Sequence, residues 1–336
     1  MANSNDEIAD IRKIIRKIGP GILKDNGNLR INSISRISSG EAHHNYLIEL
    51  NGKKFILRES AVRKDKTGGN SWAINHIERE YKALKSIEPL KIAPKMYYKD
   101  ISCRIIKRPF IIIDYIEGKQ AARITKKDLK VLAEMLAKLH RIHELRGARR
   151  ESIRSFNKEY MKKRVENLLN SNLSYHVNKS FRTSLKDAYE KIRKIKFKKT
   201  ALSLIHGDIG RENIIRNKAK IELIDWEGAR LSEPGFDIVT MFNRLQLNPK
   251  QKRYFMEEYL RSGGKDIVQL DEYEKLRCFD RLLWAIFEFI KITHKIGDKE
   301  TLKMRDRKTY VKIAHFEMKR CHSLGLFPKN LRLVIK

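Results

Sequence analysis

Residues Leu204–Asp237 read LIHGDIGRENIIRNKAKIELIDWEGARLSEPGFD, and they place three oxygen-bearing side chains among short apolar runs. Asp208 lies in the triplet HGD, Asn213 follows five residues later, and Asp225 ends an apolar run. Each of these residue types is common in ordinary turns. Their order and spacing, with an apolar strand on each side, indicate a turn and hairpin that bring the three side chains together.

Such a set suits phosphoryl transfer from ATP, which depends mostly on positioning and charge neutralisation. One carboxylate must orient the acceptor hydroxyl and take its proton, and we expect Asp208 to do this. A second carboxylate and an amide oxygen must hold Mg²⁺, which prefers oxygen ligands. Asn213 and Asp225 supply these donors. The residues therefore predict an ATP- and Mg²⁺-dependent phosphotransferase.

The motifs HGD-x4-N and IDWE resemble those of the aminoglycoside phosphotransferase and choline kinase superfamily, distant relatives of protein kinases. The resemblance covers roughly residues 31–244. It implies that Asp208 is the catalytic base, that Asn213 and Asp225 hold magnesium, and that Asp237 in PGFD braces the catalytic loop. It also implies a bilobal α+β fold, with a small antiparallel-sheet lobe followed by a larger, mainly helical lobe.

The hydrophobic pattern agrees with this layout. Strand-like runs and a helix over about 72–86 fill the first part of the chain, and Asn51-Gly52 predicts a hairpin. A first helix begins near Asp6 and is expected to stop at Gly19-Pro20-Gly21. From about residue 128 the period becomes helical. We expect a nucleotide-binding lobe over 1–117 and a catalytic and acceptor-binding lobe over 118–336.

Upstream residues complete a predicted nucleotide site. By the resemblance, Ser38-Ser39-Gly40 covers the nucleotide, although a plain turn fits the same residues. Arg58 stands where the family pattern has a lysine that pairs with the phosphates, and its planar fork suits phosphate oxygens. Glu80 would orient Arg58; the alternative is a weak surface ion pair.

The run PFIIIDYIEG resembles the strand and hinge that hold adenine. The resemblance implies main-chain contacts from the Asp114 carbonyl and the Ile116 amide. Further on, His140 and His143 lie one helical turn apart, but without a third ligand nearby we expect packing and capping roles.

A cationic acceptor would need acidic or aromatic groups. Candidate acceptor-binding residues are Glu227, Glu233, Trp284 and Glu288. Asp280, Trp284, Phe287 and Glu288 share one helical face, but such a stripe is more often core than a binding cage.

The 336 residues include 73 Lys and Arg against 41 Asp and Glu, a net charge of +32. Such a field opposes a cationic acceptor and attracts polyanions, but a solvated Lys/Glu-rich surface also accounts for it. Arg141–Thr200 alone has 18 basic against 6 acidic residues, with interleaved aromatic residues. We therefore expect a small hydroxylated metabolite as the acceptor, with RNA as the alternative. These aromatics are Tyr160, Tyr175, Phe181, Tyr189 and Phe197.

Other classes fit less well. A protein kinase is disfavoured because Trp226-Glu227 follows Asp225 and only 11 residues separate it from Asp237. A non-catalytic binding module is disfavoured because all three oxygen-bearing side chains are kept. The three dispersed cysteines, without a CxxC pair, predict neither a disulfide framework nor a cysteine zinc site. With no apolar span and no secretion signal, we expect a cytoplasmic enzyme without an obligate protein partner.

Overall fold

The computed structural model describes residues 4–23, 28–39, 43–60, 71–106, 108–143, 158–217, 220–296, 306–328 and 330–332. They form two compact units, each described here by itself. The first contains the described residues up to Met135 together with Gly210–Ala229. The second contains those of Leu136–Glu144, Arg149–Ile209 and Arg230–Lys336. The expected lobe boundary at residues 117 and 118 stays a prediction, because each unit combines separated stretches of chain.

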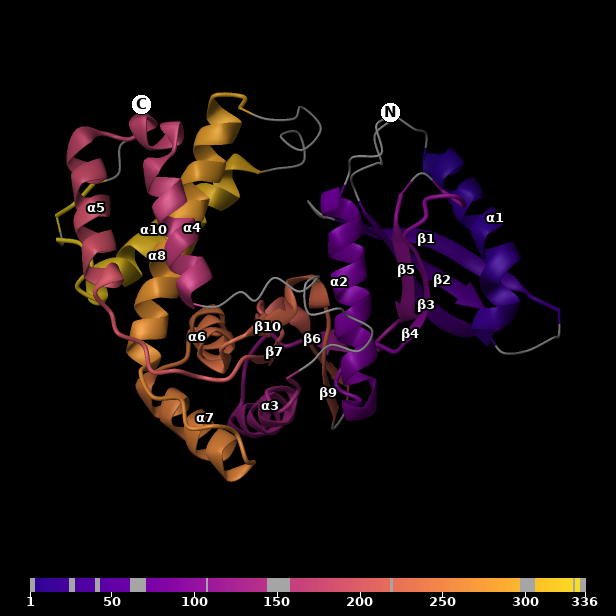
Figure 1. The fold of residues 1–336 in the computed structure, drawn as a ribbon. Coiled ribbons are helices and arrows are strands. Elements are labelled where there is room, and N and C mark those ends of the chain that lie inside the picture. The colour runs from indigo at the N-terminus through magenta and orange to yellow at the C-terminus, as the bar shows by residue number, and fades with distance from the viewer. Residues whose placement is uncertain are drawn as a thin grey trace. The chain divides into compact units, whose positions relative to one another are not determined.

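The first unit is built on a five-stranded sheet with the strand order β1-β2-β3-β5-β4 (Figure 1). All neighbouring strands in it are antiparallel. The strands are β1 (Ile31–Ser39), β2 (His43–Leu50), β3 (Lys53–Ser60), β4 (Met96–Asp100) and β5 (Phe110–Asp114). These are the strands that the alternating apolar runs predict.

The turn between β2 and β3 sets the register of the hairpin. Asn51 and Gly52 have φ angles of 48° and 75°, as a two-residue hairpin turn requires. Pairing then runs from Leu50 opposite Lys53 to His43 opposite Ser60. The predicted Asn-Gly hairpin is confirmed.

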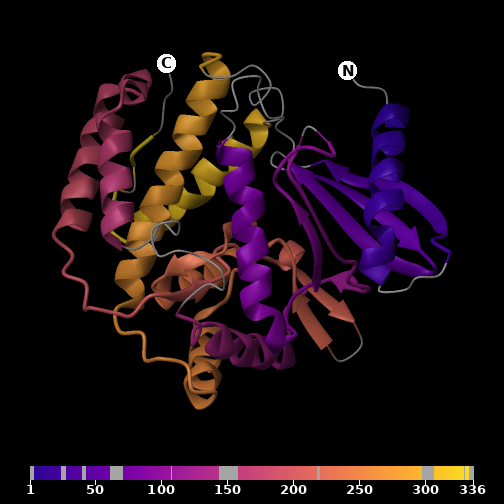
Figure 2. The same ribbon diagram turned by 45° about the vertical axis from the view of Figure 1, so that its right-hand side comes forward.

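Helix α1 (Ser4–Leu23) lies along one face of this sheet (Figures 1 and 2). Its buried isoleucines pack into a core cluster with Tyr46, Leu57 and Phe110. The predicted stop at Gly19-Pro20-Gly21 is wrong, because α1 continues through Pro20. Ile22, which is buried, extends the isoleucine stripe by one more turn, and its packing outweighs the missing Pro20 N–H.

Helix α2 (Ser71–Ile87) packs against β3, β4 and β5. Successive side chains of a strand point to opposite faces of the sheet. On β3, Leu57 faces the α1 core while Arg58 points to the other face, where it contacts Glu80 of α2. The sheet therefore separates the α1 core cluster from the Arg58–Glu80 ion pair on the α2 side.

A second, smaller sheet in this unit has the order β6-β8-β9. Its strands are β6 (Lys119–Gln120), β8 (Ile214–Asn217) and β9 (Lys220–Leu223). The 3₁₀ turn η4 (Arg211–Asn213) precedes this hairpin and η5 (Trp226–Gly228) follows it. Helix α3 (Lys126–Leu139) begins in the first unit and ends in the second. Asn213 and Asp225 thus flank one hairpin.

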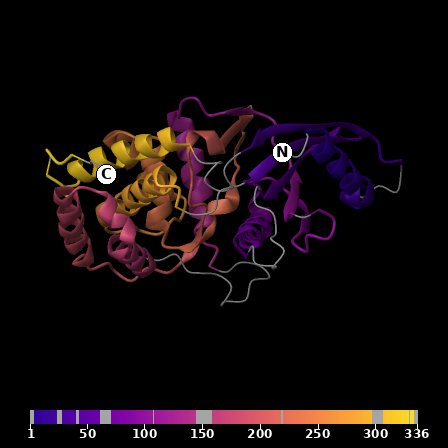
Figure 3. The same ribbon diagram turned by 90° about the horizontal axis from the view of Figure 1, so that it is seen from above.

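The second unit is mainly helical, and α8 and α10 pack side by side in it (Figures 1 and 3). Its helices are α4 (Lys158–Asn170), α5 (Lys179–Arg193), α6 (Pro234–Arg244), α7 (Pro249–Arg261), α8 (Leu270–Thr293) and α10 (Arg307–Ser323). A short ladder pairs β7 (Ser203–Ile205) with β10 (Arg230–Ser232). No helix in the described part of the chain has the length and apolar character needed to cross a membrane. The predicted α+β class is confirmed.

Candidate functional site

Arg58 is the centre of a charged cluster on the α2 face of the first unit. Its Nη1 donates to Glu80 Oε1 at 2.7 Å and to Asp225 Oδ1 at 2.8 Å, and its Nε donates to Asn45 Oδ1 at 3.0 Å. Arg58 and Glu80 are both buried, so the surface ion pair alternative is excluded. The sequence did not single out Asn45, although the Asn-Gly turn already implies that Asn45 pairs with Arg58.

The cluster keeps the guanidinium charged. Burial by itself would lower the pKa of Arg58, but the carboxylates of Glu80, Asp225 and Glu227 outweigh burial and raise it. A buried arginine held in one orientation by fixed acceptors presents its remaining N–H groups in a defined direction. This arrangement suits a phosphate-binding residue.

The hairpin β8–β9 brings Asn213 and Asp225 to the same end of the small sheet. The Ile224 N–H donates to the Asn213 carbonyl oxygen at 3.0 Å, one residue before Asp225. Asn213 is buried, and Asp225 has a left-handed φ of 68°, a conformation in which Asp and Asn are enriched. A carboxylate and an amide oxygen on one hairpin end are donors that fit a hard cation such as Mg²⁺.

The other predicted nucleotide residues lie at or just beyond the ends of strands of the large sheet. Ser38 and Ser39 end β1, and Gly40 lies outside the described residues. Asp114 ends β5, where its N–H donates to the Lys95 carbonyl oxygen and its carboxylate accepts from Tyr97 Oη at 2.7 Å. Ile116 follows two residues later, and its contact with adenine stays a prediction.

In the second unit, the HGD loop is held by Asp237 of α6. The backbone N–H groups of His206 and Gly207 donate to the two Asp237 carboxylate oxygens at 3.0 and 2.8 Å. Gly207 has a φ of 82°, which favours glycine at this turn. The predicted bracing role of Asp237 is confirmed.

His140, the residue after α3, supports the same brace. Its Nε2 lies 3.2 Å from Asp237 Oδ2 and its Nδ1 lies 2.9 Å from Tyr259 Oη. Both Asp237 and His140 are fully buried. The expected packing role of His140 therefore holds, whereas His143 contacts the Leu202 carbonyl oxygen instead.

Asp208 follows this loop and is partly exposed. Arg244 Nη1, from the last turn of α6, donates to Asp208 Oδ1 at 2.8 Å. Sequence reasoning missed Arg244, because nothing in its spacing links it to the HGD triplet. Its spacing from Asp237 was the available signal: the two residues lie two helical turns apart on α6, so both can face the HGD loop.

The two predicted acidic acceptor residues of the second unit, Glu233 and Glu288, are each paired with a lysine. Glu233 is buried and lies 3.8 Å from Lys158 Nζ, and Glu288 lies 3.2 Å from Lys291 Nζ. Trp284 packs against Tyr310 of α10, with ring centroids 5.2 Å apart. The fourth candidate, Glu227, belongs to the first unit. An acceptor role for these residues stays a prediction.

Of the five aromatic side chains of the basic segment, Phe181 is buried, Tyr175 is exposed, and Tyr160, Tyr189 and Phe197 are partly exposed. Phe181 is fully buried in α5, so it cannot stack on a nucleic-acid base. Phe197 packs against Tyr273, with ring centroids 5.1 Å apart, while Tyr175 is exposed. The segment therefore contributes to the core of the second unit.

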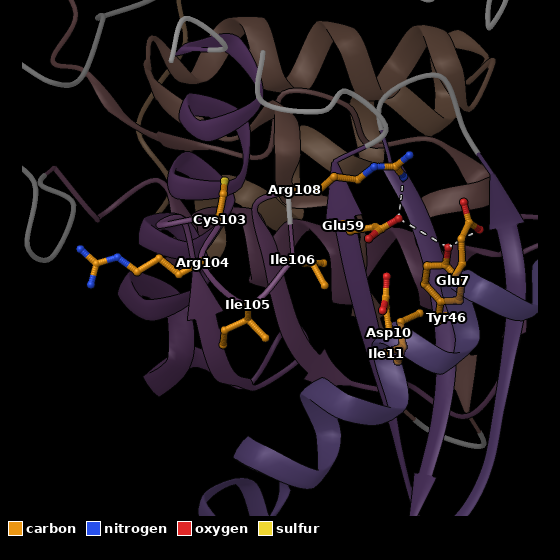
Figure 4. Close-up of a pocket in the computed structure, with 10 residues that line it drawn as sticks. All are labelled: Glu7, Asp10, Ile11, Tyr46, Glu59, Cys103, Arg104, Ile105, Ile106 and Arg108. Carbon is orange, nitrogen blue, oxygen red and sulfur yellow. Dashed lines mark hydrogen bonds and ion pairs between the residues drawn. The ribbon is translucent and has the colours of Figure 1, made fainter. Parts of the chain in front are cut away.

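A pocket of about 510 Å³ lies on the α1 face of the large sheet (Figure 4). Arg108, Glu59, Tyr46 and Glu7 form a chain of contacts along it, with Arg108 Nη1 2.7 Å from Glu59 Oε1. Burial raises the pKa of Glu59, although the guanidinium of Arg108 acts in the opposite direction. Because strand side chains alternate, this pocket and Arg58 lie on opposite faces of the sheet.

Proteins of known sequence and structure resemble this chain over most of its length. Protein LicA of Haemophilus influenzae is 22% identical over 265 residues, which are 76% of this chain and 72% of that protein. Choline kinase LicA from Streptococcus pneumoniae has a TM-score of 0.59 at 20% identity, covering 91% of this chain and 99% of the other. Ethanolamine kinase from Plasmodium vivax has a TM-score of 0.65 at 16% identity, covering 97% and 89%.

A putative aminoglycoside phosphotransferase from Ralstonia eutropha has the same fold, with a TM-score of 0.62 at 12% identity and coverage of 94% and 98%. At these identities the solved structures establish the fold. The model of the phosphotransferase enzyme family matches residues 33–278, which include every charged residue of the two clusters described above. The chain therefore belongs to the phosphotransferase enzyme family.

Proposed function

We propose that this protein transfers the γ-phosphate of ATP to a hydroxyl group of a small metabolite, with Asp208 as the catalytic base. The observation that carries the proposal is the cluster in which Arg58 joins Glu80 and Asp225 at 2.7 and 2.8 Å. This contact supports the proposal because the guanidinium that would bind phosphate lies directly beside the carboxylate that would hold magnesium. A structural ion pair between Arg58 and Glu80 alone would not need the second carboxylate, that of Asp225.

Asp208 is suited to the base role because it is partly exposed and its loop is held rigidly by Asp237. We expect the Asp208 carboxylate to accept a hydrogen bond from the acceptor hydroxyl and to take its proton as the acceptor oxygen bonds to the γ-phosphorus and the bond from that phosphorus to the departing ADP breaks. Arg244 positions this carboxylate through Oδ1. Arg58 would bind phosphate oxygens of the nucleotide.

Asn213 and Asp225 would hold magnesium. Their donors are one amide oxygen and one carboxylate at the same hairpin end, which is the oxygen set that this cation prefers. When bound, magnesium neutralises charge on the phosphates.

Amino alcohols are the first acceptors to test, because proteins of similar sequence or fold include LicA, a choline kinase and an ethanolamine kinase. The net charge of +32 opposes a cationic acceptor at long range. The panel should therefore contain choline, ethanolamine, neutral sugars, nucleosides, an aminoglycoside and tRNA, with ADP release as the readout. Turnover of tRNA alone would favour the RNA alternative, and no turnover with any hydroxyl compound would contradict the proposed function.

The variant Asp208→Asn tests the base directly. It keeps the size of the side chain but cannot accept the proton, so kcat should fall by about 10²–10⁴-fold while the KM for ATP changes little. Asp266→Asn is the matched control, since Asp266 is exposed in the same unit. A variant Asp208→Asn with near-normal kcat would remove Asp208 from this role.

A further inference from the structure

Three side chains with metal-ligand chemistry meet in the first unit, in addition to the proposed magnesium ligands. His43 begins β2, His76 lies in α2 and Glu227 lies in η5. One ligand atom from each lies within 4.8 Å of the other two. The sequence did not group these residues, because they come from three distant parts of the chain.

The fold explains why they meet. Alternation along β2 puts His43 on the same face as Asn45, which contacts Arg58, and puts His44 on the opposite face. His76 lies one helical turn before Glu80, so both point to this face. Helix α2 also packs directly against η5, which carries Glu227.

Two buried polar atoms, His43 Nδ1 and Glu80 Oε2, make no hydrogen bond within the described residues. The other ring nitrogen of His43, Nε2, pairs with Glu227 Oε2 at 2.7 Å. His43 is only 5% exposed, so bulk water does not reach it easily. Clustered buried groups of this kind point to an ion or ligand.

We propose that His43, His76 and Glu227 form a binding site for a divalent transition-metal ion such as Zn²⁺. Two imidazoles and one carboxylate are a known zinc ligand set that leaves a further position open. Ligand atoms bound to one zinc ion lie roughly 3–4 Å apart, so side-chain movements of about 1 Å complete the site. Three carboxylates, those of Glu80, Asp225 and Glu227, lie near this site, against the two guanidinium groups of Arg58 and Arg79.

This site differs from the proposed magnesium site in its chemistry. Imidazole nitrogen selects zinc, cobalt, nickel or copper, whereas Mg²⁺ prefers oxygen. An ion bound here would connect β2, α2 and η5. It would therefore stabilise α2, which carries Glu80, and η5, which directly follows Asp225. Its role would be to hold the Arg58 cluster together.

The test uses Co²⁺, which reports its coordination by visible absorption, added to the tag-free full-length protein in excess Mg²⁺. We expect one equivalent of Co²⁺ to give the intense band of a four- or five-coordinate ion, and Zn²⁺ to displace it and raise the Tm. His43→Asn and His76→Asn should each weaken Co²⁺ binding by at least about 100-fold, since even an outer-shell change costs 10–100-fold.

His44→Asn is the matched control, because His44 is the neighbouring histidine on the opposite face, where it contacts Arg36. It should keep the band. The proposal is overturned if excess Co²⁺ gives no such band on the wild-type protein, or if His44→Asn removes the band as His43→Asn does. If a histidine variant does not fold, Glu227→Gln and the wild-type titration decide. None of these readouts depends on phosphotransferase activity.

Discussion

Asp237 shows how one buried side chain organises a loop at the residue scale. Its two oxygens accept the N–H groups of His206 and Gly207, which immediately precede Asp208. Buried backbone donors are costly to leave unsatisfied, so the loop conformation depends on this carboxylate. The Asp208 side chain is therefore positioned by a residue 29 places further along the sequence.

Asp237→Asn should lower the free energy of unfolding by about 1–3 kcal/mol, because the amide can satisfy only one of the two backbone donors. Urea denaturation near pH 7 measures this, with the exposed Asp266→Asn as the control. Equal stability of the two variants would show that the loop has another support.

The same variant predicts a pH dependence. Burial alone would raise the pKa of Asp237, but the interactions with His140, His206 and Gly207 outweigh it and hold the pKa below the ordinary value of 3.8. A depressed pKa contributes stability that is complete above the unfolded value and is lost as the pH falls through the folded value. The stability difference between wild type and Asp237→Asn should therefore be constant near neutrality and shrink below about pH 3.8.

At the scale of elements, short-range rules predicted most strands and helices, and packing decided the exceptions. The Asn51-Gly52 turn follows from the conformational freedom of its residues. The length of α1 does not follow from local rules, because a proline such as Pro20 ordinarily ends a helix. Packing of Ile22 in the core cluster against the sheet stabilises the final turn. Cys278 and Cys321 likewise meet across α8 and α10, with Sγ atoms 3.0 Å apart, although they are far apart in sequence.

Two Gly→Ala variants test the turn. A Cβ at Gly52 or at Gly21 would meet no atom within 4 Å, but only Gly52 has a positive φ. Gly52→Ala should therefore destabilise the protein by about 1–2 kcal/mol. Gly21→Ala, in helix α1, should stabilise it by about 0.5 kcal/mol. Thermal denaturation of both variants measures the sign, and shifts in the same direction would contradict this explanation.

At the scale of the whole molecule, the dominant quantity is the net charge of +32. A field of one sign acts on every charged ligand at long range and is screened by salt. Its effect depends on the charge of the ligand and not on the details of one site. Nucleotide and acceptor should therefore respond to salt differently.

Raising the salt concentration should lower kcat/KM for ATP by roughly two- to tenfold between about 20 and 200 mM, because screening removes the attraction of an anion. For a cationic alcohol the change should have the opposite sign, and for a neutral sugar it should be small. Steady-state kinetics at constant Mg²⁺ measure all three. If kcat/KM changes in the same way with salt for all three substrates, the net charge does not steer substrates and belongs only to the solvated surface.

The sequence alone determined the fold class and the Asn-Gly hairpin, and it singled out Asp208, Asn213 and Asp225 as candidate site residues, because these depend on short-range periodicity, turn chemistry and motif spacing. Only the tertiary structure decided that Arg58 is buried between Glu80 and Asp225, that Arg244 contacts Asp208, and that His43, His76 and Glu227 meet. Such contacts join residues that are distant along the chain. They follow from which face of a strand or helix each side chain occupies, and that is settled only when the elements pack.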